Sequence, residues 1–489
     1  MQTRPFSPNL LLLIALSCAS LTLSPPVSAQ DAEGGAGDPA LKGRLDKLLN
    51  DSKLSKVKVG VHVRDLDSGE TLYGRNADTP LNPASNIKLV TAAAVLDKYG
   101  PGHTFTTELH ATATSGDTIT GDLVLKGGGD PFLLWSHLLE MAERARRKGF
   151  TRIKGDIVID DTVFDDAFMP PAFDQKSEDS AYRASVSGAA AEFGALTINV
   201  TPRGAGEKPR ITFDPPNDYA TVQSTAVVVK EKDEARKEAL QIKAAPDGDR
   251  TAIQISGKTW PRGGATVRKR MDNPSLYTGY LLRRALKLLG ITVEGKIRRG
   301  PLPGGTRLLA RHTSYTMNYN IAAMQKWSNN YMAEMLFKSL DMGDAPATWA
   351  GAQKAALAFL EKAGVKGELK LTNGSGLYDA NALSAAQFTQ VLYYLQRRPD
   401  ILPDFESSFA IAGVDGTLKR RMKSGPANTV ARGKTGTLSG VVTLTGYVQT
   451  LKGRRIGFSV LFNDTRGGAW GYRRLQDDLV EAITDWGNK

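Results

Sequence analysis

Three short motifs hold the residues of this chain that could do chemistry together. Ser85 and Lys88 form an S-x-x-K motif, Ser328 and Asn330 form an S-x-N motif, and Lys434 begins a K-T-G motif. A serine hydroxyl becomes a nucleophile when a neighbouring base accepts its proton, and a neutral lysine amine can be that base. Each motif also occurs by chance, so its context decides whether it is a site.

The sequence after Ser85 distinguishes it from a second S-x-x-K motif at residues 55–58. Residues 87–99 are rich in helix formers and end at a Gly-Pro stop signal. Positions three apart share one helix face, so Lys88 is expected beside the Ser85 hydroxyl. Free N–H groups at the helix start would stabilise an oxyanion. Residues 55–58 instead open a strand, so Ser85 is the predicted nucleophile.

Lys88 can act as a base only if its amine is neutral. The pKa of a free lysine is about 10.4, so burial or nearby positive charge must lower it to roughly 7. Lys434 could supply that charge and could attract a substrate carboxylate. Gly436 would leave a strand surface open to a peptide, and Thr435 and Thr437 present hydroxyls. These four residues are predicted to bind substrate.

Two distant parts of the chain supply the elements that would position the motifs. Residues 57–64 alternate in polarity and, with residues 71–73, predict a hairpin before the Ser85 helix. From residue 315 onward helices are predicted at residues 331–340, 349–363 and 384–396, the last with a capping box. Strands at residues 441–449 and 455–462 and a helix at residues 475–486 follow.

Residues 105–310 separate these two parts and have a different character. Short alternating segments between Gly, Pro and Asp predict strands at residues 119–125, 153–159, 196–200, 211–213 and 252–255. Two polar stretches, residues 177–183 and 230–238, predict exposed loops or short helices without an assigned function. The fold prediction is therefore one α/β domain, residues 42–104 and 311–489, split by a β-rich insert of two nested domains.

The first residues predict export. Arg4 precedes an apolar run over residues 10–23, and the small residues 27–29 end in Ala29, the expected cleavage position of a signal peptide covering residues 1–29. The run is too short and interrupted for a membrane span of about 20 residues. A lipid on Cys18 is the less favoured alternative, because the residues before it fit poorly. Residues 30–41 predict a linker, and the expected compartment is the periplasm.

Composition and charge limit the classes of molecule that the chain is expected to bind. The chain has 489 residues, 41% hydrophobic and 23% charged, which is typical of a folded soluble body. Cys18 is its only cysteine and falls in the removed segment, so no disulfide framework is expected. The net charge of +12 favours weak association with anionic wall polymers or a membrane surface over nucleic acid, once export is assumed. A charge that merely keeps the protein soluble fits equally well.

The chain resembles the low-molecular-mass penicillin-binding proteins of class C, serine peptidase family S13. The resemblance covers nearly all of the mature chain and includes residues 83–89, 127–131, 373–377, 412–418 and 434–438. The long interval between Lys88 and Ser328 also fits, because this family carries two extra domains there. The resemblance implies a periplasmic D-alanyl-D-alanine carboxypeptidase or endopeptidase that trims peptidoglycan peptides and reacts with β-lactams, without a cofactor.

The resemblance also implies roles for the motif residues. Ser85 would be the acylated nucleophile, Lys88 its base and Ser328 a proton shuttle to the leaving amine. Asn330 would bind the substrate amide. The residues that would hold the terminal carboxylate are Lys434, Thr435 and Thr437. The backbone N–H groups of Ser85 and Thr437 would form the oxyanion hole.

One loop departs from the family pattern, which usually has Asp-Gly-Ser-Gly where this chain has Asn373 to Gly376. If this loop, with Ser375 and Gly376, approaches the site, an Asp at its first position would raise the pKa of a nearby lysine. Asn373 keeps the size and hydrogen bonding without the charge. It is also a strong turn former beside glycine, so a purely structural role is an equal alternative.

Three other functions are weighed against this one. A β-lactamase shares the motifs, but no suitably placed Glu can be assigned and the long insert argues against it. A catalytically idle wall-binding protein is expected to have lost Ser85, Lys88 or Lys434, and none is lost. A metallopeptidase or histidine triad is disfavoured, and no metal is expected, because the five histidines are scattered without metal-binding spacing: His62, His103, His110, His137 and His312.

Overall fold

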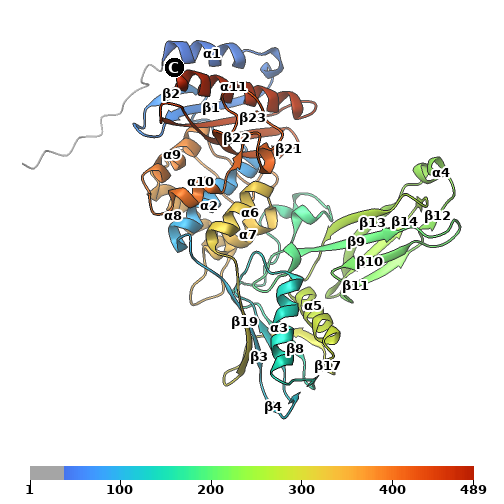
Figure 1. Cartoon of the computed structure of the whole chain (residues 1–489). Helices are drawn as coiled ribbons and strands as arrows, with labels where there is room; N and C mark the ends of the chain where they lie inside the picture. Colours follow the sequence, from blue (N-terminus) through green and yellow to red (C-terminus); the bar gives the residue numbers. More distant parts are fainter. Residues whose placement is uncertain (1–37) are drawn as a thin grey trace, which may run out of the picture. The chain divides into compact units, whose positions relative to one another are not determined.

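The computed structural model describes residues 38–489 (Figure 1). The predicted signal peptide, the Cys18 alternative and most of the predicted linker lie outside the described residues. Helix α1 (Pro39–Leu49) begins before the predicted end of the linker at residue 41, because the Asp38 carboxylate accepts the N–H groups of Ala40 and Leu41 and caps it. No helix within residues 38–489 combines the length and apolar character needed to cross a bilayer.

A six-stranded antiparallel sheet joins the two ends of the described chain. Its strand order is β2-β1-β23-β22-β21-β20. The bounds are β1 (Lys58–Asp65), β2 (Thr71–Arg75), β20 (Ala410–Ile411), β21 (Ala431–Leu438), β22 (Val441–Gln449) and β23 (Arg455–Asn463). Strands β1 and β23 pair along their whole length, with Lys58 opposite Asn463 and Asp65 opposite Ile456. The predicted hairpin and the predicted C-terminal strand pair are confirmed.

Helices cover both faces of this sheet (Figure 1). Apolar residues of α1 and α11 (Trp470–Asn488) pack against one face, in a core that includes Val61 and Val460. The other face is covered by α2 (Ile87–Tyr99), α6 (Met317–Trp327), α7 (Asn330–Ser339), α8 (Trp349–Lys362) and α9 (Ala385–Gln396), with α10 (Leu402–Ser407) beside them. The predicted capping box of α9 is present, since Ser384 and Gln387 exchange hydrogen bonds.

Helix α2 runs through the middle of this second layer. Every residue from Ile87 to Leu96 is buried, so the helix is enclosed on all sides and not only along one stripe. The long aliphatic stem of Lys88 therefore enters the core with its amine. The position of this helix determines that the predicted base is removed from water.

The region between β3 (Thr106–Ala111) and β19 (Arg307–Thr313) forms five further sheets. Their strand orders are β18-β8-β6-β3-β19, β17-β7-β5-β4, β10-β9-β16, β11-β14-β13 and β12-β15. The strands are β4 (Thr114–Ser115), β5 (Thr118–Ile119), β6 (Leu123–Lys126), β7 (Arg152–Ile153), β8 (Ile157–Asp160), β9 (Ala195–Thr201), β10 (Arg210–Asp214), β11 (Ala220–Ser224), β12 (Val227–Val228), β13 (Gln241–Asp247), β14 (Arg250–Ser256), β15 (Lys258–Thr259), β16 (Ala265–Arg270), β17 (Thr292–Val293) and β18 (Ile297–Arg299).

Two details of this region correct the prediction. It contains two long helices that the sequence analysis did not predict, α3 (Trp135–Arg147) and α5 (Pro274–Leu288). The short α4 (Lys232–Lys237) lies within residues 230–238, where a loop or short helix was predicted. Asn273 caps α5 and Pro274 begins it, a start signal that the strand-rich neighbourhood obscured. Strand β19 pairs with β3, so the boundary predicted after residue 310 falls inside a strand.

Candidate active site

Ser85 and Lys88 lie next to each other at the start of α2. Ser85 is in a 3-10 turn (Ala84–Asn86) that leads directly into the helix. The Lys88 Nζ lies 3.0 Å from Ser85 Oγ. This is the contact that the S-x-x-K spacing predicts, because one helical turn separates the two residues.

The surroundings of Lys88 contain neutral hydrogen-bond acceptors. Its Nζ donates to Asn330 Oδ1 at 2.8 Å and to the carbonyl of Ser375 at 2.7 Å. Both of these oxygens can only accept, so a neutral Lys88 would spend its two N–H groups on them and direct its lone pair at Ser85. Burial lowers the pKa of Lys88 to about 7, against an opposing effect of Glu334. Of the two causes left open by the sequence, burial is the one that lowers this pKa.

Glu334 is a buried site residue that the sequence did not identify. Its carboxylate accepts the N–H groups of Gly374 at 3.1 Å and Ser375 at 2.8 Å, so it fixes the loop whose carbonyl contacts Lys88. Burial raises the pKa of Glu334, and the hydrogen bonds from Ser375 and Gly374 and the charge of Lys88 lower it. Glu334 follows Asn330 by four positions, one helical turn, and this spacing is the signal that could have identified it.

Ser328 lies in the junction between α6 and α7, with its backbone in the left-handed region at φ +54°. A non-glycine residue held there is uncommon and is typical of positions that the surrounding structure constrains. Lys434 Nζ donates to Ser328 Oγ at 2.8 Å and to the Thr435 carbonyl at 2.7 Å. Burial and the charge of Lys88 lower the pKa of Lys434 well below its usual range.

Asn330 links the base to a segment to which the sequence analysis assigned no function. Its Nδ2 donates to the carbonyl of Tyr182 at 3.0 Å. Tyr182 belongs to a short 3-10 turn within residues 177–183, the stretch predicted as an exposed loop or short helix. Arg183 is buried and donates to the Phe173 carbonyl, which anchors the turn. Tyr182 therefore lies beside the motifs, and local sequence did not indicate this because only the tertiary fold brings it there.

The K-T-G motif lies on strand β21, beside the Ser85 turn. A Cβ on Gly436 would lie 2.1 Å from Thr443 Oγ1 and 2.9 Å from the Pro83 carbonyl. Close packing against this turn therefore explains Gly436, in place of the open strand surface that was predicted. Arg473 of α11 donates to Thr437 Oγ1 at 3.1 Å, which adds an exposed cation that the sequence did not suggest.

A cleft of about 580 Å³ opens above these residues. It is lined by the predicted residues Ser85, Ser328, Asn330, Gly376 and Thr437, and also by Gln175, Lys176, Tyr182, Leu377, Tyr378, Asp379, Leu438 and Ser439. The structure does not place Thr435 in this cleft. Thr435 lines a second, basic cleft of about 870 Å³ with Lys419, Arg420, Arg421, Arg473 and Arg474.

The loop that begins at Asn373 does approach the site. The Asn373 side chain is buried. It donates to the Pro171 carbonyl at 3.0 Å and accepts the Gly376 N–H at 2.9 Å. A Cβ on Gly376 would lie 1.9 Å from the Ala84 carbonyl, so the loop packs directly on the Ser85 turn. These contacts give Asn373 a structural role in the turn. Its effect on the titration of the site stays a prediction.

Comparison with known proteins places the chain among peptidases. Residues 41–483 match the model of the D-Ala-D-Ala carboxypeptidase 3 (S13) family. A D-alanyl-D-alanine carboxypeptidase of an Actinomadura species is 32% identical over 474 residues, 94% of this chain and 87% of the relative. These matches favour the predicted peptidase over a β-lactamase or an idle wall-binding protein.

Solved structures show the same fold. Penicillin binding protein 4 of Haemophilus influenzae superposes with a TM-score of 0.78 at 23% identity, covering 91% of this chain and 99% of that one. The same protein complexed with a β-lactam gives a TM-score of 0.75 at 24% identity, with the same coverage. The predicted fold class is confirmed.

Proposed function

The chain belongs to the D-Ala-D-Ala carboxypeptidase 3 (S13) family, and we propose that it cleaves peptidoglycan stem peptides at D-alanyl bonds through an acyl-enzyme on Ser85. The observation that carries the proposal is the buried Lys88 amine, 3.0 Å from Ser85 Oγ and otherwise bonded to neutral acceptors. Such an amine can take the hydroxyl proton at neutral pH.

Acylation uses the contacts of the cleft in sequence. Ser85 Oγ attacks the carbonyl of the D-alanine before the scissile bond, and its proton passes to Lys88. The C–O bond forms first and gives a tetrahedral oxyanion, whose collapse breaks the C–N bond as the leaving amine receives the proton held by Lys88. Ser328 would relay that proton, because its hydroxyl lines the same cleft. A water molecule then hydrolyses the ester and regenerates the Ser85 hydroxyl.

The terminal carboxylate of the substrate would bind near Lys434, Thr437 and Arg473. Lys434 and Arg473 each donate to a hydroxyl that lines the cleft. An anion beside Lys434 favours its charged form, and a charged Lys434 disfavours a second charge on Lys88. Substrate binding would thus keep the base neutral at the moment it is needed. Asn330, which contacts both Lys88 and the Tyr182 carbonyl, would orient the substrate amide.

The proposal includes the setting of the enzyme. The chain would act in the periplasm after removal of residues 1–29, with β-lactams as covalent inhibitors at Ser85 and weak association with anionic wall or membrane surfaces. Residues 39–104 and 314–489 would form the catalytic domain, and the insert would run from residue 105 to the end of β19 at residue 313. The β-lactam complex of the Haemophilus influenzae protein supports the inhibitor class.

Labelling with a tagged penicillin tests the nucleophile. We expect one label per chain on Ser85, no label in Ser85→Ala and full labelling in Ser55→Ala, the matched change in the second S-x-x-K motif. Label on another residue, or undiminished labelling of Ser85→Ala, would contradict the proposal.

Purified muropeptides test the reaction. Mass analysis that finds free D-alanine alone would identify a carboxypeptidase, and conversion of dimers to monomers would identify an endopeptidase. A labelled protein that releases neither product would contradict the proposed substrate class.

A further inference from the structure

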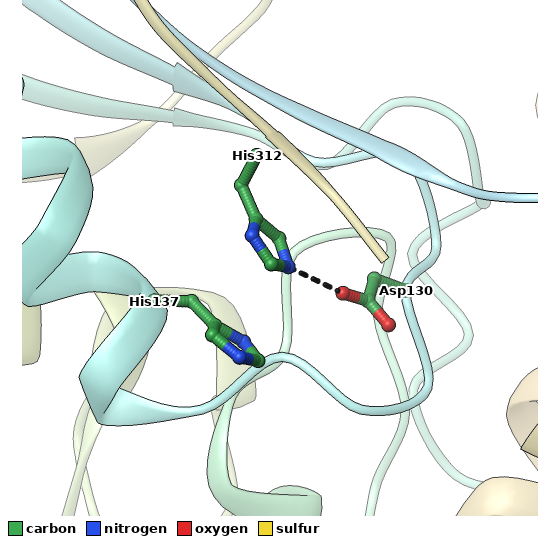
Figure 2. A group of neighbouring side chains, drawn as sticks. All are labelled: Asp130, His137 and His312. Atoms are coloured by element: carbon green, nitrogen blue, oxygen red, sulfur yellow. Dashed lines mark ion pairs between the residues drawn. The ribbon is translucent and has the colours of Figure 1, made fainter. Parts of the chain in front are cut away.

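Three side chains that can bind metal ions lie together outside the Ser85 cleft (Figure 2). Asp130 is in the loop after β6, His137 is in the first turn of α3, and His312 is on β19. One ligand atom of each lies within 4.8 Å of the others. The sequence predicted scattered histidines, but β19 pairs with β3 and β3 pairs with β6, which brings His312 beside the loop of Asp130.

Two polar atoms of this cluster have no hydrogen-bond partner among the described residues. They are Asp130 Oδ2 and His312 Nε2, which face each other at 3.3 Å, within ion-pair distance if the imidazole is protonated but without the geometry of a hydrogen bond (Figure 2). The Asp130 side chain is only 1% exposed, and its other oxygen accepts the Phe132 N–H at 2.8 Å. Beside a neutral imidazole this buried carboxylate oxygen has no partner, which is costly, so a cation that binds both atoms would remove that cost.

The spacing fits a small transition-metal ion. Zinc bonds to histidine nitrogen and carboxylate oxygen at about 2.0–2.2 Å, so two ligands of a tetrahedral ion lie about 3.3–3.5 Å apart. The distance of 3.3 Å between Asp130 Oδ2 and His312 Nε2 is such an edge. Two imidazoles and one carboxylate are a donor set typical of zinc, whereas calcium and magnesium prefer oxygen ligands alone.

His137 is the ligand that would have to move. Its ring stacks on His312 with centroids 4.1 Å apart and planes at 20°, so the two rings do not yet converge on one point. His137 Nδ1 accepts the Leu134 N–H at 3.2 Å. Binding through Nε2 would place a proton on Nδ1, and binding through Nδ1 would replace this contact, so either mode gives up one long hydrogen bond.

We propose that Asp130, His137 and His312 bind one divalent transition-metal ion, zinc above all, with water completing its coordination. The ion would be structural, because it ties the loop after β6, the start of α3 and the end of β19 to one point. Phe132, two residues after Asp130, packs against the rings of Tyr315 and Trp327. Trp327 directly precedes Ser328, so the ion would steady the connection that carries the S-x-N serine.

Metal titration of the full mature chain, first stripped with a chelator, tests this site. We expect calorimetry to give one zinc ion per chain and cobalt to give the intense visible bands of a tetrahedral site. The His137→Gln and His312→Gln variants should each lower the affinity at least about tenfold. Zinc at a hundredfold excess over its Kd should raise the Tm of the wild type by about 2 °C or more. It should leave the Tm of the double variant His137→Gln/His312→Gln unchanged.

A matched control separates this site from incidental binding by histidine. His103 stacks on Tyr99 outside the cluster, so His103→Gln should bind zinc as the wild type does. Penicillin labelling of Ser85 in each variant shows that the fold is intact and separates this result from the proposed function. Absence of zinc binding by the wild type, or equal binding by the double variant His137→Gln/His312→Gln, would overturn the proposal.

Discussion

Two buried lysines in the same helical layer behave differently. Lys338 of α7 donates to Asp165 at 2.5 Å and to the Ala167 carbonyl, and its amine lies over the ring of Trp349. Lys88 of α2 is equally buried but donates to a hydroxyl and two neutral carbonyl oxygens. Burial lowers the pKa of both, and Asp165 opposes this shift at Lys338 by direct contact. A buried lysine becomes a base when its hydrogen-bond partners carry no charge.

The sharpest test of this comparison replaces each lysine by methionine. Lys88→Met should lower penicillin acylation about 10²–10⁴-fold, because the proton of Ser85 loses its acceptor. Lys338→Met should acylate normally and lose about 1–3 kcal/mol of stability, since Asp165 loses its partner. Stopped-flow acylation rates and thermal unfolding measure the two effects. A large loss of acylation in Lys338→Met with its fold intact would contradict the claim that only Lys88 serves as a base.

Lys434 extends the comparison to a second buried amine in the site. Lys434→Ala should reduce acylation about 10–100-fold, as expected for the loss of a charged hydrogen-bond donor. Lys434→Arg should retain part of the activity, because charge is kept while shape changes. Rates measured with penicillin and with a peptide substrate test this order. Equal activity of all three proteins would remove Lys434 from the site.

The pH dependence tests the opposing effect of Glu334. Acylation should be lost as the pH falls through about 7, because the neutral form of Lys88 is the base. Glu334→Gln removes an anion that raises the pKa of Lys88, so its acidic limb should move to lower pH. One N–H of the Gly374–Ser375 pair would also lose its acceptor, at a cost of about 1–3 kcal/mol. An acidic limb that does not move would exclude Glu334 as an electrostatic influence on the base.

Asn373→Asp should have the smallest effect on the pH profile and the opposite sign. A carboxylate would face the Pro171 carbonyl where Asn373 Nδ2 now donates, so the main result should be a lower Tm. Added negative charge near Lys88 should move the acidic limb slightly to higher pH. Acylation rates measured against pH for Asn373→Asp and for Glu334→Gln show in which direction each change moves the acidic limb. If the acidic limbs of the Asn373→Asp and wild-type pH profiles overlap, Asn373 has only a structural role in the turn.

Local signals predicted the elements that hold the motifs, and tertiary contacts supplied the rest. The hairpin before Ser85 and the capping box of α9 follow from alternation and spacing within a few residues. The contact of Tyr182 with Asn330 and the approach of His312 to Asp130 join residues far apart in the chain, which no local pattern encodes. Glu334 lies between these cases, because its helical spacing from Asn330 was visible while its burial was not.

The central sheet combines strands from both ends of the chain, and this affects the order of folding. Strand β1 finds its partner β23 only after nearly the entire chain has been synthesised, since Lys58 pairs with Asn463. Until then the β1–β2 hairpin has an exposed edge that can pair with other chains. Contacts so distant in sequence form slowly, because a long loop must close first. Assembly of the sheet beside Ser85 therefore comes late, and a chain truncated before β23 would lack the strand that joins β22, and through it β21 beside the Ser85 turn, to β1.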